Sequence, residues 1–161
     1  MPYDREKAVA YAREWAFRRN PQFYDFENIG GDCTNFISQC IYAGCGVMNY
    51  TPVTGWYFIS LNNRAPAWTG VQFLYNFLTG NKGAGPYGVP LPLDQAMIAD
   101  VIQLSPDGYK FTHSLFIVAA GEPPAPDNIR ITTHTRDSDY RLLNTYTYNK
   151  LRLIHILGAR L

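Results

Sequence analysis

The sequence has few of the residues that would build a metal centre or a disulfide scaffold. Its 161 residues include three cysteines, Cys33, Cys40 and Cys45. An odd number leaves at least one free thiol, and this spacing fits no zinc-binding pattern. We therefore expect no disulfide framework, no metal and no cofactor.

Long hydrophobic runs are also missing. No stretch approaches the roughly 20 consecutive apolar residues of a membrane-spanning helix. Residues 1–21 lack the apolar core of a secretory signal. The sequence therefore predicts a soluble chain with no transmembrane segment and no signal peptide, cytoplasmic as written unless another route exports it.

An excess of charge of either sign is missing as well. The net charge is +1, which gives no electrostatic reason to expect binding to nucleic acid. Hydrophobic residues make up 47% and charged residues 17%, an ordinary composition for a globular protein. At this length we expect one domain spanning residues 1–161; its oligomeric state is left open.

Helical periodicity dominates the first half of the chain. Apolar residues recur at helical spacing in residues 4–19, 32–44 and 70–79. Asp4 and Asp32 stand at the expected N-caps of the first two helices. Residues 80–92, rich in glycine and proline, are expected to form a surface loop, interpreted as a lid over a groove.

The second half changes to strand patterns. Expected strands cover residues 101–104, 111–119 and 129–135, and residues 146–157 hold one strand or two. The sequence thus predicts an α+β fold, with N-terminal helices packed on a C-terminal antiparallel meander.

Cys33 is the candidate nucleophile. It follows Gly30, Gly31 and Asp32 in the first turn of a predicted helix, where unpaired N–H groups and the helix dipole favour a thiolate. Gly31 would let backbone amides approach a substrate carbonyl as an oxyanion hole. From position alone, an inert packed thiol is equally acceptable for Cys33, and it is the preferred interpretation for Cys40 and Cys45.

A base is needed to activate the thiol. His113 opens a predicted strand and His134 ends the next one, so antiparallel pairing would make them neighbours. His113 would take the thiol proton, and His134, Asp137 or Asp139 would orient its imidazole. His155, in the middle of a predicted strand, is expected to be structural.

At this point the chain resembles a known family. The run from Gly30 to Gln39, GGDCTNFISQ, resembles the signature of the bacterial putative amidase domain, related to CHAP amidases and NlpC-like peptidases of the papain-like clan. Motifs around Trp15, Trp56, Asp100 and His113 extend the resemblance over most of the chain. Ala99 departs from it, because a glycine is expected there, and Asp100 is expected to tighten a turn.

The resemblance implies a papain-like, NlpC-like fold with Cys33 as nucleophile, His113 as base and His134 as third member. Gly31, Asp32 and Trp56 would form the oxyanion and substrate-positioning part of the site. The implied reaction is hydrolysis of peptidoglycan peptide or amide bonds through a thioester.

Two alternatives stay open. The aromatic residues Trp56, Tyr57 and Trp68 would line a groove of a carbohydrate- or peptide-binding module with an inert thiol. The same Cys-His-His set would also serve an acyl transferase.

Overall fold

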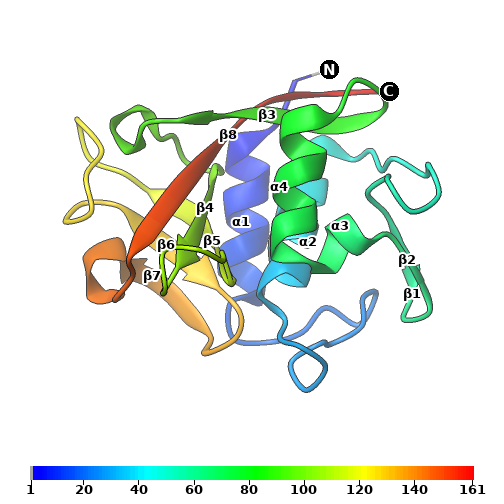
Figure 1. The fold of residues 1–161 in the computed structure, drawn as a ribbon, viewed down its shortest axis with the longest axis horizontal. Coiled ribbons are helices and arrows are strands. Elements are labelled where there is room, and N and C mark those ends of the chain that lie inside the picture. Colours follow the sequence, from blue (N-terminus) through cyan, green and yellow to red (C-terminus); the bar gives the residue numbers. More distant parts are fainter. Residues whose placement is uncertain (1) are drawn as a thin grey trace.

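A computed structural model describes residues 2–161 (Figure 1). A six-stranded antiparallel sheet has the strand order β3-β8-β4-β5-β6-β7. Its strands are Gly85–Leu91 (β3), Val101–Ser105 (β4), His113–Ala119 (β5), Arg130–Thr133 (β6), Ser138–Leu142 (β7) and Lys150–Arg160 (β8). The predicted α+β class is confirmed.

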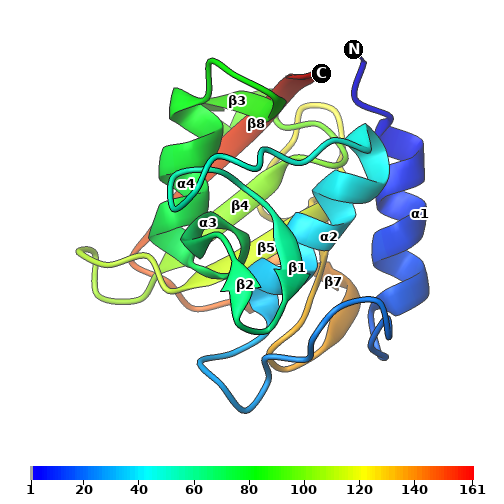
Figure 2. The ribbon, with the colours of Figure 1, turned by 90° about the vertical axis from the view of Figure 1, so that its right-hand side faces the viewer.

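The helices gather on one face of this sheet. In both ribbon views α2 lies between α1 and the α3–α4 pair (Figures 1 and 2). Their bounds are Arg5–Trp15 (α1), Cys33–Cys45 (α2), Pro66–Thr69 (α3) and Val71–Gly80 (α4). Two further strands, Phe58–Ser60 (β1) and Asn63–Arg64 (β2), form a separate hairpin, and two 3-10 turns occupy Leu93–Gln95 and Leu143–Thr145.

Local signals explain where the main helices begin and end. The Asp4 carboxylate accepts a 3.0 Å hydrogen bond from the N–H of Lys7, so the predicted cap of α1 is confirmed. This helix ends at Trp15, earlier than expected. Gly46 closes α2 in the left-handed conformation, φ +68°, with its N–H bonded to the carbonyl of Tyr42.

Two hydrophobic clusters occupy opposite faces of the sheet. Alternate residues of β5 serve each: Phe116 and Val118 pack toward the helices, whereas Leu115 and Ile117 pack on the other face. The helix-side cluster contains Phe36, Ile37, Ile41, Trp56, Trp68 and Leu74. This alternation also decides which way the residues at the start of β5 face.

The expected lid at residues 80–92 was wrong. Gly85–Leu91 is strand β3, paired antiparallel with β8 at one edge of the sheet. Proline lacks an N–H donor, but an edge strand has one side that needs no donor, so Pro86 and Pro90 are tolerated there. Only β4 to β7 follow the predicted meander, because β8 inserts between β3 and β4.

Candidate active site

Cys33 is the first residue of α2 and is 8% exposed. Its Sγ accepts hydrogen bonds from the backbone N–H groups of Ser114 and Thr34, and the Thr34 hydroxyl lies 3.8 Å away. Ser114 belongs to β5, and its own hydroxyl lies 3.0 Å from the hydroxyl of Thr34. The start of α2 is thereby fixed against the start of β5.

Burial raises the pKa of the Cys33 thiol above its ordinary value, and the nearby Asp32 charge raises it further. The hydrogen bonds from Ser114 and Thr34 oppose this rise without cancelling it. The expectation that the helix start lowers the thiol pKa was wrong for this state. Covering Sγ with β5 costs the thiolate more hydration than the local amides restore.

His113 lies at the start of β5, on the face of the sheet away from α2. Its ring stands 6.0 Å from the ring of Tyr146, while Ser114 takes the α2-facing position. Burial, and to a smaller extent the positive charge of Arg141, lower the pKa of His113 to about 4. Among residues 2–161, nothing forms a hydrogen bond with its imidazole, Cys33 and His134 included.

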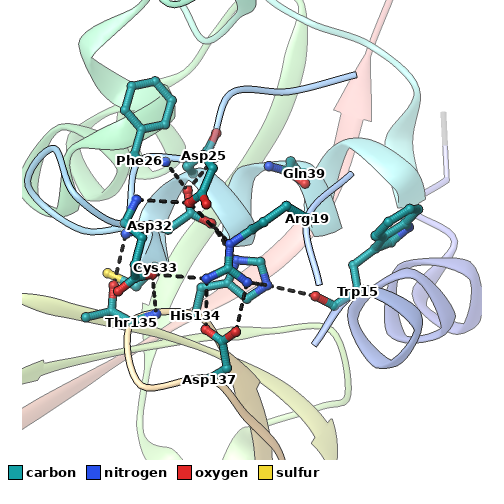
Figure 3. A network of polar contacts seen from close by, with 12 residues as sticks. Trp15, Arg19, Asp25, Phe26, Asp32, Cys33, Gln39, His134, Thr135 and Asp137 are labelled. Atoms are coloured by element: carbon teal, nitrogen blue, oxygen red, sulfur yellow. Dashed lines mark hydrogen bonds and ion pairs between the residues drawn. The ribbon is translucent and has the colours of Figure 1, made fainter. Parts of the chain in front are cut away.

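His134 lies on the α2 side and is 1% exposed. Its Nδ1 lies 2.5 Å from Oδ2 of Asp32, and its Nε2 lies 2.7 Å from the carbonyl oxygen of Trp15 (Figure 3). The ring stacks on Phe36 with centroids 3.9 Å apart. Both nitrogens therefore have partners other than His113, and the predicted hydrogen bond between the two histidines is absent.

The carboxylates proposed as alternative third members are also occupied elsewhere. Asp137 forms a two-pronged ion pair with Arg19 at 2.8 and 3.0 Å (Figure 3). Asp139 pairs with Arg13. Neither contacts His113, because both face the α1 side of the molecule.

Asp32 and Gly31 shape the approach to Cys33. The fully buried Asp32 carboxylate accepts hydrogen bonds from the N–H of Phe26 and the side chain of Asn35, both at 2.8 Å, and makes no capping bond to α2. The backbone N–H of Asp32 donates to Oγ1 of Thr135 at 2.9 Å. Gly31 adopts φ +97°, a conformation that favours glycine. The Asp32 carboxylate thus organises the loop and has no exposed surface.

The tryptophans do not line a groove. Trp56 and Trp68 are fully buried, with ring centroids 4.6 Å apart. The indole N–H of Trp56 donates to Ser38, and that of Trp68 donates to Asn35. Both anchor α2 to the segment that follows it, which corrects the substrate-positioning role expected for Trp56 and removes the main support for a binding module.

A surface cavity of about 550 Å³ opens at the start of β5, next to the turn between β6 and β7. It is lined by Thr112, His113, Thr135, Arg136, Arg141, Thr145, Tyr146 and Thr147. Two of these residues adjoin groups at the start of α2: Thr135 accepts the N–H of Asp32, and His113 precedes Ser114, whose N–H bonds Sγ of Cys33. Sequence analysis did not single out the two arginines: Arg136 lies in the turn before β7 and Arg141 lies within β7.

The remaining candidates are structural. Cys40 and Cys45 are buried free thiols, as expected. Asp100 closes the predicted turn through the N–H of Met97 and also pairs with His155, 2.8 Å away. Ala99 adopts φ +67°, which explains why a glycine is expected at this position.

The fold and the site together define an α+β protein with a candidate cysteine nucleophile at the start of a helix packed on an antiparallel sheet. The chain belongs to the family of the putative amidase domain, whose sequence model matches residues 2–157. This membership supports an amide hydrolase, an enzyme that acts on C–N bonds.

The chain is also 33% identical, over 144 residues, to the uncharacterized protein YhbB of Bacillus subtilis (strain 168). The match covers 86% of this chain and 43% of YhbB, so the chain spans less than half of that relative. No solved structure matches the chain.

None of the helices in residues 2–161 is long and apolar enough to cross a bilayer. Over the same residues, no group of three or more His, Cys, Asp or Glu side chains has an arrangement that could hold a metal ion.

Proposed function

We propose that the protein is a cysteine-dependent amide hydrolase of the papain-like type, with Cys33 as its nucleophile. The observation that carries this proposal is the placement of Cys33, at the first turn of α2 and beside a cavity that His113 lines. The family supports amide hydrolysis at a coarse level, and Cys33 lies within the matched residues.

In the proposed reaction, the Cys33 thiol gives its proton to His113 and the sulfur attacks the amide carbonyl. The leaving amine takes the proton from His113, and water then releases the acyl group from the thioester. The N–H of Cys33 has no acceptor among residues 2–161, so it is available to bind the oxyanion.

This role requires His113 to move. Its imidazole now stands beside Tyr146, and His113 pairs with Leu104 of β4, so bringing the ring to the α2 side requires the backbone at the start of β5 to turn. Catalytic hydrogen bonds often tighten only when substrate binds. The neutral state that burial and Arg141 impose on His113 is the state a base needs.

His134 acts in this proposal through Asp32 and not through His113. The His134–Asp32 pair, together with Arg19, holds the loop from Phe26 to Asp32 in front of the nucleophile. His134 is therefore a positioning residue for Cys33. Peptidoglycan peptides are the proposed substrate class, supported by the resemblance to cell-wall amidases.

Replacing Cys33 tests the proposal directly. Cys33→Ala is expected to reduce hydrolysis of purified peptidoglycan or of a chromogenic amide by about a thousandfold or more, because the other two thiols, Cys40 and Cys45, are buried in the hydrophobic core. Cys45→Ser is the matched control, because Cys45 is also buried and bonds only the carbonyl of Val47. Undiminished turnover by Cys33→Ala would refute the cysteine mechanism.

A further inference from the structure

The charged groups around the cavity all have one sign. Among its lining residues, Arg136 and Arg141 are always cationic, His113 is titratable, and none is a carboxylate. Within residues 2–161, no ion pair joins either arginine to an acid. The cavity therefore holds two positive charges without an acidic partner, and it adjoins Cys33 through His113, the residue before Ser114, and through Thr135, which bonds the N–H of Asp32.

The nearby acids are already committed to another arginine. Asp137, next to Arg136 in the chain, holds Arg19 through both oxygens. Glu27 accepts from Arg19 and from the N–H of Thr135. These two acids lie close to the cavity, but neither forms a salt bridge with Arg136 or Arg141.

Arg141 is held in place for contact with a ligand. Its guanidinium stacks 3.8 Å from the ring centroid of Tyr146, and its Nε donates to the hydroxyl of Thr145 at 2.7 Å. The other side of the cavity carries Thr135 and Arg136 in left-handed backbone conformations, φ +60° and +61°. These two conformations form the turn that joins β6 to β7, where Thr133 pairs with Ser138.

We propose that this cavity is a carboxylate subsite, so that the protein acts on amides whose peptide or amino-acid portion carries a free carboxylate next to the bond attacked by Cys33. An arginine fork recognises a planar carboxylate through paired hydrogen bonds. The surrounding threonine hydroxyls add neutral donors. This inference deepens the proposed function and rests on Cys33 being the residue that the bound substrate meets.

Alkylation of Cys33 tests the subsite without requiring turnover. Iodoacetate and iodoacetamide both form an S–CH₂ bond and release iodide, and they differ by a carboxylate against a neutral amide. At neutral pH, the ratio of the iodoacetate rate to the iodoacetamide rate at Cys33 is expected to exceed the ratio for the urea-unfolded chain by on the order of tenfold. Mass spectrometry of the Cys33 peptide separates it from Cys40 and Cys45.

Arginine variants assign the effect to the cavity. Arg136→Gln and Arg141→Gln are each expected to lower the ratio toward the unfolded value, whereas Arg18→Gln, an exposed arginine of the α1 end, leaves it unchanged. The Arg136 side chain is exposed and makes no hydrogen bond or ion pair within residues 2–161, so its variant remains informative if Arg141→Gln unfolds.

Three results would overturn the subsite: equal ratios in folded and unfolded protein, a ratio that neither arginine variant changes, or failure of both reagents to reach Cys33. A preference for iodoacetate in a protein that hydrolyses no amide would leave the subsite standing and refute the proposed function.

Discussion

His113 loses hydration when the chain folds, and this loss couples its titration to stability. Its pKa falls from 6.5 to about 4, through burial first and the Arg141 charge second. Between these values the unfolded chain binds a proton that the folded chain does not, so the free energy of unfolding rises with pH across this window and falls on acidification.

Replacing His113 is therefore expected to remove that dependence. Urea unfolding of His113→Asn, measured from about pH 4 to 6.5, should lose less stability on acidification than the parent chain. In Arg141→Gln, the pH range over which stability changes should be narrower, because the pKa of His113 moves back toward its ordinary value. Parallel pH profiles for the parent and His113→Asn would show that His113 is not desolvated in the folded state.

Some residues of the candidate site could be recognised from the sequence and others could not. Cys33 was recognisable because its signals are local: two glycines, an aspartate and a helical pattern. The partners of Asp32 were not, because His134 lies 102 positions away and its orientation depends on which face of β6 meets α2. The direction of the Cys33 pKa shift also depends on burial by β5, which no local pattern records.

Among the elements, strand β3 depends on a close backbone approach. A Cβ on Gly88 would lie 2.5 Å from the carbonyl oxygen of His155 in β8, at the register shift between Tyr87 and Gly88. That oxygen belongs to the paired backbone and cannot turn aside.

Gly88→Ala is therefore expected to lower the free energy of unfolding by about 1–3 kcal/mol, as overpacking does. Gly80→Ala is the matched control, because nothing lies within 4 Å of a Cβ at the end of α4. It should be neutral or stabilising by up to about 1 kcal/mol. Denaturant unfolding compares the two, and equal stabilities would contradict the close contact.

Helices and strands with a clear hydrophobic pattern could be predicted from the sequence, whereas the strands at the edges of the sheet could not. The patterns for α2, α4, β4, β5 and β6 fall on buried faces, so burial enforces their periodicity. β3 contains Pro86 and Pro90, and β7, with the sequence SDYRL, has no fully buried residue. An edge strand needs only one partner and little apolar surface, so composition alone does not separate it from a loop.

Taken as a whole, the molecule protects both edges of its sheet. β3 uses prolines and β7 uses charged and polar residues, each of which discourages pairing with another chain. The interior strand β8 is the last in the sequence, so the sheet is complete only when the end of the described chain pairs with β3 and β4. Long-range contacts of this kind could not be read from local patterns.

Arg5 connects the first helix to the centre of the sheet. Its guanidinium donates to Oδ1 of Asp100 at 2.7 Å and to the carbonyl oxygen of Ile156 at 2.5 Å, across sequence separations of 95 and 151 residues. The Asp100 side chain is 0% exposed and that of Arg5 is 17% exposed. If Arg5 were removed, water could not reach the Asp100 carboxylate to replace the guanidinium.

Arg5→Gln is therefore expected to lower the free energy of unfolding by about 3–5 kcal/mol, because it leaves a buried carboxylate undercompensated. Arg13→Gln is the control: Arg13 pairs with Asp139 at 2.7 Å, but its side chain is 44% exposed. Such exposed pairs contribute about 0–1 kcal/mol. Urea unfolding measures both, and a cost for Arg5→Gln no greater than that for Arg13→Gln would mean that His155 and the backbone amides alone stabilise Asp100.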